Sequence, residues 1–169
     1  MPTLVLITEV AAPQTRCFDL ARCVEFHLSS MRHTGERAVA GTTYGLLTQG
    51  DTITWEGRHL FVRQRLTSRI TAFERPHFFA DEMVQGAFHS FRHEHRFETV
   101  STDLTRVTDT FTFRSPLGPL GHVADALFLR RYMYRLLSGH QQNLKNSLED
   151  GTWARFLPDH VQPPPPATL

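Results

Sequence analysis

Two histidines and an aspartate on neighbouring predicted strands could do chemistry together. His93 and His95 alternate with charged residues in the segment HSFRHEHRFE, residues 89–98. Because successive side chains of a strand point to opposite faces, both imidazoles are expected on the apolar face. Asp109 lies on the same face of the next predicted strand, residues 104–114. If the two strands form a hairpin, Asp109 can hydrogen-bond His95, which would raise the pKa of the imidazole and orient its ring.

Such a carboxylate–imidazole pair suits either ligand anchoring or proton transfer, and buried pairs of this kind are also often purely structural. The H-x-H spacing also resembles the chelating pairs of β-rich zinc and iron proteins, with Asp81 or Asp109 as a third ligand. In a chain with ten histidines this short motif has little specificity. We therefore predict no metal site and no cofactor.

Period-two alternation predicts an inward face that is mostly aromatic and aliphatic, as in both ligand pockets and ordinary cores. A bulge would move part of a strand to the other face. The polar members must pair with one another, hold water or meet a ligand, because burial without a partner costs about a few kcal/mol. The predicted inward set is Ile53, Trp55, Leu60, Val62, Gln64, Leu66, Phe79, Asp81, Met83, Phe91, His93, His95, Phe97, Val107, Asp109, Phe111 and Phe113.

The elements that position these residues follow a simple order along the chain. A strand over residues 4–10 precedes two short helices that meet near residues 22–24, and antiparallel strands fill most of residues 36–114. A long helix is predicted over residues 115–148, with Ser115 as its N-cap and Pro116 in its first turn. Its apolar residues recur in steps of three and four, the period of one helical face: Leu120, Val123, Ala124, Leu127, Phe128, Met133, Leu136, Leu137, Leu144 and Leu148.

Composition indicates one ordinary globular domain over residues 1–150 and a proline-rich tail over residues 151–169. The chain has 169 residues, 40% of them hydrophobic, and a formal net charge of +1. That charge gives no argument for a nucleic-acid partner, and no apolar run is long enough for stable membrane insertion. Without a signal-peptide pattern, a cytoplasmic location is expected. Cys17 and Cys23 are six residues apart on a predicted helical stretch, which favours two free thiols.

Four segments resemble the START-like, or SRPBCC, superfamily, which includes polyketide cyclases and pollen-allergen-like proteins. They are VAAPQTRCFDLARCVEFHLSSM, GLLTQGDTITWEGRHLF, FADEMVQGAFHSFRHEHRF and DTFTFRSPLGPLGHVADALF. The similarity covers about residues 3–148 and is greatest to bacterial ligand-binding SRPBCC proteins that carry a cell-division label. It implies an α+β helix-grip fold, in which a curved antiparallel sheet of six or seven strands wraps around a long C-terminal helix. Two short helices follow the first strand, and a cavity separates sheet and helix.

Members of the superfamily bind hydrophobic or amphipathic molecules such as lipids, quinones, steroids or polyketides, and a minority are enzymes. They share no single catalytic motif, so the resemblance assigns no catalytic residue. Our first hypothesis is therefore a protein that binds such a molecule internally, with no nucleic-acid partner. The expected ligand-binding residues are Trp55, Gln64, Phe79, Asp81, Met83, Phe91, His93, His95, Asp109 and Phe111.

Two alternatives belong to other classes of protein. In a cyclase- or aromatase-like enzyme, His95 and Asp109 would be catalytic and would move protons on the bound molecule. In an interaction module, the outward-facing Arg63, Arg65 and Arg69, with Arg75 beyond them, would bind a protein partner. The same arginines are also typical of an ordinary solvated face.

Overall fold

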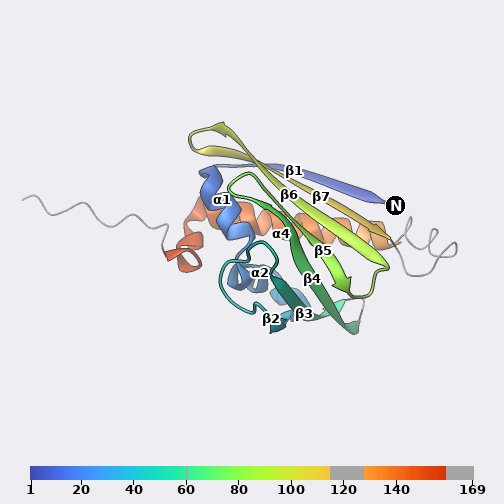
Figure 1. The fold of residues 1–169 in the computed structure, drawn as a ribbon. Coiled ribbons are helices and arrows are strands. Elements are labelled where there is room, and N and C mark those ends of the chain that lie inside the picture. Colours follow the sequence, from blue (N-terminus) through green and yellow to red (C-terminus); the bar gives the residue numbers. More distant parts are fainter. Residues whose placement is uncertain (60, 115–127, 159–169) are drawn as a thin grey trace, which may run out of the picture.

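A computed structural model describes residues 1–59, 61–114 and 128–158 of the chain (Figure 1). Within these residues, seven strands form one antiparallel sheet in the order β1-β7-β6-β5-β4-β3-β2. The strands are β1 (Thr3–Val10), β2 (Arg37–Gly41), β3 (Thr52–His59), β4 (Val62–Glu74), β5 (Phe78–Gln85), β6 (Ser90–Ser101) and β7 (Leu104–Arg114). The helices are α1 (Gln14–Ala21), α2 (Val24–Ser30), η1 (Arg32–Thr34), α4 (Arg130–Asp150) and η3 (Thr152–Arg155).

The sheet curves around α4, and α1 and α2 lie at one end of the molecule (Figure 1). Helix α1 packs against β6, β7 and α4, while α2 packs against α4 and β2. The predicted α+β helix-grip architecture is therefore confirmed, including the division of residues 14–31 into two short helices. Helix α4 ends at Asp150 and is capped by Gly151, whose φ of 85° suits a residue without a side chain. The predicted first half of the helix, including Ser115 and Pro116, lies outside the described residues.

The β6–β7 hairpin holds the predicted chemical residues in register. Its strands pair directly, with His93 opposite Phe111 and His95 opposite Asp109. Burial alternates along β7 as the sequence predicts, because the odd-numbered side chains from residue 105 to 113 are buried and those between them are not. The predicted bounds of this strand, residues 104–114, are also those of the structure.

Two clusters of apolar side chains form the core. In the larger cluster, the ring of Phe18 meets Phe73, Phe79 and Phe97 edge-on, at centroid distances of 5.3, 5.5 and 5.4 Å. The smaller cluster contains Leu4, Phe91, Phe111, Phe113 and Met133. Edge-to-face aromatic contacts contribute about 0.5–1.5 kcal/mol each beyond the area they bury. Helix α4 contributes to both clusters and so holds the two ends of the sheet together.

The inward face of β4 differs from the prediction at both ends of the strand. Val62 was expected inside, but its side chain is 58% exposed, because it lies at the tip of the β3–β4 hairpin beside the turn residue Phe61. At the other end, the register shifts between Ile70 and Ala72, and Phe73 packs against the core. Bulges change which residues of a strand face inward in this way. Leu60 lies outside the described residues.

Residues beyond Asp150, which the sequence analysis placed in the tail, include η3 and a buried side chain. Leu157 is 3% exposed and belongs to the larger core cluster, against which Trp153 and Phe156 also pack. The remainder of the predicted tail, from residue 159, lies outside the described residues. Cys17 and Cys23 are both buried and free, as predicted.

Two arginines of the outward face, Arg63 and Arg65, pair with a carboxylate of the chain itself. Arg65 donates from Nε to Oε2 of Glu56 at 2.8 Å, and Arg63 lies 3.8 Å from the other oxygen of that carboxylate. Arg75 does not belong to this row, since it binds the buried carboxylate of Asp19. None of the described helices combines the length and the apolar character needed to cross a lipid bilayer.

Candidate functional site

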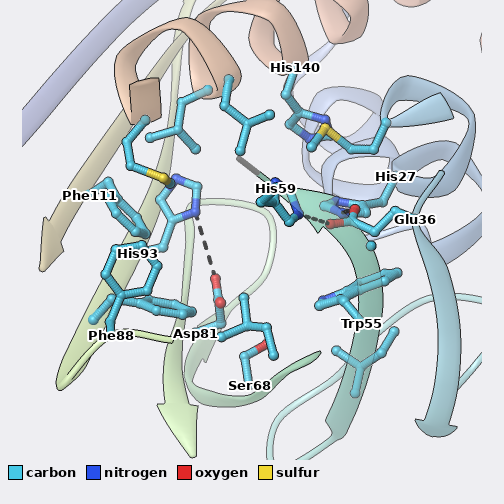
Figure 2. A pocket seen from close by; sticks show the side chains of 18 of the residues that line it. His27, Glu36, Trp55, His59, Ser68, Asp81, Phe88, His93, Phe111 and His140 are labelled. Atoms are coloured by element: carbon cyan, nitrogen blue, oxygen red, sulfur yellow. Dashed lines mark hydrogen bonds and ion pairs between the residues drawn. The ribbon is translucent and has the colours of Figure 1, made fainter. Parts of the chain in front are cut away.

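A cavity of about 440 Å³ lies between the inner face of the sheet and the helices (Figure 2). Side chains from β3, β4, β5, β6 and β7 form one wall, and α4 and α2 contribute to the other. Most of the lining is aromatic or aliphatic, with a few titratable side chains between. This combination is typical of a small-molecule site, where the polar groups orient an apolar guest.

Most of the predicted ligand-binding residues line this cavity. They are Trp55, Gln64, Phe79, Asp81, Phe91, His93, His95 and Phe111. Two predicted residues do not line it. Met83 is half-buried, lies opposite Ser68 of β4 and packs against the smaller core cluster. Asp109 does not line the cavity, but it hydrogen-bonds His95, which does.

Four titratable residues of β5, β6 and β7 form one group, which we call the Asp81 group: Asp81, His93, His95 and Asp109. Nδ1 of His95 donates a hydrogen bond to Oδ1 of Asp109 at 2.8 Å, and the other Asp109 oxygen accepts one from Gln141 Nε2 at 3.2 Å. Oδ1 of Asp81 lies 3.6 Å from Nε2 of His95 and 4.0 Å from Nδ1 of His93. The hydrogen bond predicted between His95 and Asp109 is therefore present.

Electrostatics separates the two histidines of this group. Burial alone would lower the pKa of His95, but the carboxylates of Asp109 and Asp81 outweigh it and raise the pKa to about 9. Burial and the neighbouring His95 lower the pKa of His93 to about 4. Although burial alone would raise the pKa of Asp109, His95 lowers it. At neutral pH the imidazole of His93 is therefore neutral. The neighbouring imidazole of His95 can hold a proton between the carboxylates of Asp81 and Asp109.

A second group of polar residues, which the sequence analysis missed, lines another part of the cavity: His27, Glu36, His59 and Tyr132. The Glu36 carboxylate accepts hydrogen bonds from Nε2 of His27 at 2.8 Å and Nε2 of His59 at 3.3 Å. Although burial alone would raise the pKa of Glu36, these two bonds lower it to about 2. We call these residues the Glu36 group.

The hydrogen bonds of the Glu36 group involve both ring nitrogens of His59. A carboxylate only accepts hydrogen bonds, so Nε2 of His59 carries a proton. The hydroxyl of Tyr132 hydrogen-bonds Nδ1 of the same ring at 2.8 Å. Gly57 permits this arrangement, because a Cβ there would lie 3.2 Å from Cγ of Glu36 and 3.3 Å from Nε2 of His59.

Some of these residues carried a sequence signal and others did not. His59 continues the alternation of Ile53 and Trp55 along β3, and His140 continues the helical steps from Met133 to Leu144 on α4. His140 lines the cavity, hydrogen-bonds Ser30 at 2.9 Å, and has a pKa lowered to about 3, mainly by burial. No sequence signal pointed to His27 or Glu36, because the contact between them depends on how α2 packs against the chain just before β2.

The two groups face the cavity from different sides. Figure 2 shows Asp81 and His93 near Phe88 and Phe111 on one side, and His27, Glu36 and Trp55 on the other. Trp55 stacks on His27 with ring centroids 4.2 Å apart. A guest that fills the space can therefore place apolar atoms against aromatic walls and polar atoms at either end.

Searches of protein-family models and of curated proteins return no match to this chain. Solved structures do match. The protein TTHA0849 from Thermus thermophilus is 16% identical, with a TM-score of 0.71 over 87% of this chain and 97% of its own. Zhui aromatase/cyclase from Streptomyces sp. R1128 is 14% identical, with a TM-score of 0.64 over 91% and 94%. Ara h 8.0201 is 10% identical, with a TM-score of 0.58 over 85% and 97%.

These identities establish a shared fold and nothing finer. The chain has the START-like, or SRPBCC, helix-grip fold that its sequence resembles. None of the three matches supports the cell-division label that the sequence resemblance suggested.

Proposed function

We propose that this protein binds a hydrophobic or amphipathic small molecule in the cavity and carries or sequesters it. The observation that supports this most strongly is the combination of about 440 Å³ of space with an aromatic and aliphatic lining. A folded interior is ordinarily packed with few voids larger than a water molecule. Space of this size is therefore better explained by a guest than by imperfect packing.

The polar groups narrow the chemical class of the guest. Tyr132, through its oxygen lone pairs, accepts a hydrogen bond, and the Asp81 group offers imidazole and carboxylate atoms to polar atoms of the guest. A mostly apolar molecule with oxygen atoms at both ends fits this distribution. Lipids, quinones and polyketides differ in how many such atoms they carry and where.

Native mass spectrometry of protein purified from cells tests the proposal. A retained mass in the range of a lipid, quinone or polyketide is expected, and it should disappear after denaturation and extraction into organic solvent. Phe91→Asp places a charge in the apolar wall and should abolish the retained mass. Phe78→Asp, at a half-buried residue of β5 outside the cavity lining, is the matched control.

A second candidate function is cyclase- or aromatase-like catalysis, and the His95–Asp109 pair favours it. A histidine held by a carboxylate beside a cavity can move a proton to or from a guest. The matched Streptomyces protein is itself an aromatase/cyclase. His95→Gln should then abolish turnover of the recovered guest while leaving its affinity nearly unchanged, whereas equal loss of both favours binding alone.

A further inference from the structure

His93 is a largely buried imidazole whose nitrogens make no hydrogen bond within the described part of the chain. Nε2 has no partner, and Nδ1 faces Oδ1 of Asp81 at 4.0 Å, too far for a hydrogen bond. Buried polar atoms are nearly always paired, so an exception calls for a functional explanation. Its nearest polar neighbours are the two other residues of the same wall, Asp81 and His95.

The separations between these three side chains are close to those of ligands that share one ion. One donor atom from each of Asp81, His93 and His95 can be chosen so that all lie within 4.8 Å of one another. The Asp81 oxygen is 3.6 Å from Nε2 of His95. Around a tetrahedral zinc ion with bonds of about 2.0–2.2 Å, ligand atoms are about 3.3–3.6 Å apart. Small side-chain shifts therefore suffice to close the site.

Asp109 supplies the supporting contact that metal-binding histidines usually have. It accepts the proton of His95 Nδ1 at 2.8 Å, which leaves Nε2 directed toward Asp81. A carboxylate in this position fixes the tautomer of the ring and makes the opposite nitrogen a better ligand. Gln141 holds the second oxygen of Asp109 and orients the carboxylate.

Charge favours a cation at the same place. Among the ion pairs of the described residues, Asp81 and Asp109 pair only with histidines, and no arginine or lysine reaches either carboxylate. Two largely buried carboxylates of like charge are unfavourable unless something positive lies between them. A proton on His95 supplies one such charge, and a dication bound by Asp81 and the two imidazoles would displace that proton and supply two.

We propose that Asp81, His93 and His95 form a binding site for a divalent transition-metal ion, for which zinc has the closest chemical fit. Two imidazoles and one carboxylate are a donor set that zinc accepts, and three protein ligands leave a fourth position open. His93 and His95 line the cavity, so the open position faces the space for the guest. The sequence analysis considered Asp81 as a third ligand but predicted no metal, because an H-x-H spacing has little specificity in a chain with ten histidines.

The role of the ion rests on the proposed function, although its binding does not. At the open position the ion would hold and polarise an oxygen atom of the guest. The cavity would then select between guests at the end where the ion lies, because a guest without a metal-binding oxygen cannot contact the ion. The guest would then be an oxygenated molecule such as a quinone or polyketide rather than a plain hydrocarbon.

Metal binding by the full chain, stripped with a chelator and dialysed, provides the test. Isothermal titration with Zn²⁺ should show one ion per chain, and Co²⁺ should give the visible absorption of a tetrahedral site. Asp81→Asn and His93→Gln should each weaken binding by more than the ~10–100-fold that loss of a supporting contact costs, and Asp109→Asn by about that amount. His33→Gln, at an exposed histidine outside the cavity, should change nothing.

The outcomes separate the metal site from the proposed function. No uptake of Zn²⁺ by the natural sequence, or unweakened uptake by either folded variant, Asp81→Asn or His93→Gln, overturns the metal site. Near-UV circular dichroism shows whether each variant is folded, and either folded variant decides the question. Uptake of an apolar fluorescent probe by the metal-free chain is measured in parallel. Zinc binding without probe uptake supports the metal site and contradicts the proposed binding function. Probe uptake without zinc binding supports the binding function and contradicts the metal site.

Discussion

Nδ1 of His95 lies 2.8 Å from Oδ1 of Asp109, across directly paired positions of β6 and β7. The pair is buried, and Asp109 is itself 5% exposed. His95 therefore presents its other nitrogen to the cavity in an orientation that the sheet fixes. The same hydrogen bond therefore stabilises the β6–β7 hairpin and orients the imidazole in the cavity wall.

Asp109→Asn should destabilise the protein by about 1–3 kcal/mol, because it replaces the charged acceptor of a buried hydrogen bond. Glu94→Gln is the matched control on the same hairpin, since Glu94 pairs with Arg92 near the surface and should cost less than about 1 kcal/mol. Urea unfolding at neutral pH measures both. Equal losses in the two variants would show that the buried pair has no special importance.

Tyr132→Phe should lower the free energy of unfolding by about 0.5–1.5 kcal/mol, because Nδ1 of His59 loses its hydrogen-bond partner. Tyr134→Phe on the same helix is the control, since Tyr134 is 50% exposed and no contact of its hydroxyl is found among the described residues. Thermal unfolding of both variants measures the difference. An unchanged midpoint for Tyr132→Phe would contradict the arrangement of the Glu36 group.

Glu36→Gln should cost most above about pH 4.5, the ordinary pKa of a glutamate, because there the carboxylate is ionised and bonded in the folded state. Its folded pKa is lowered to about 2, so the folded protein keeps the charge while the unfolded chain takes up a proton. The stabilisation is therefore lost as pH falls from about 4.5 toward 2.

The difference in unfolding free energy between Glu36→Gln and the natural sequence isolates this carboxylate from the others that titrate in acid. The difference should shrink steadily over that pH range in urea unfolding. A difference independent of pH would mean that Glu36 is not held by His27 and His59.

Leu157→Ala should cost about 2–4 kcal/mol, because Leu157 is 3% exposed within the larger core cluster. Val100→Ala, at a side chain that is 46% exposed in β6, should cost much less. Chemical unfolding of both variants measures how much the residues after Asp150 contribute to the core. A negligible effect of Leu157→Ala would show that the folded domain ends where the sequence analysis placed its boundary.

Local periodicity explains why the sheet was predicted well. The alternation of charged and apolar residues in β6 and β7 identified which face of each strand is buried and placed His95 beside Asp109. Uneven spacing in residues 14–31 indicated two helices, and the structure divides them between Ala21 and Val24. Patterns of this kind lie within one element, and one sequence is enough to read them.

The errors arose where several elements meet or where a strand is irregular. The bulge in β4 that brings Phe73 into the core has no mark in the residue pattern. The Glu36 group joins α2, the residue before β2, β3 and α4, so no single period reveals it. Val62 follows the alternation but lies at the tip of a hairpin, where strand parity does not ensure burial.

Filling the cavity with protein atoms tests its role most directly. Ser68 on β4 is 3% exposed and lines the cavity, and no hydrogen bond of its hydroxyl is found among the described residues, so Ser68→Phe adds bulk without breaking a contact. Thr71→Phe, on the outer side of the same strand, adds the same ring away from the cavity. An apolar fluorescent probe is titrated into the natural sequence and both variants.

We predict saturable uptake of one probe molecule by the natural sequence, an affinity about tenfold weaker or worse for Ser68→Phe, equal to about 1.4 kcal/mol, and no change for Thr71→Phe. Absence of saturable uptake, or the same affinity in all three proteins, would contradict an internal binding site.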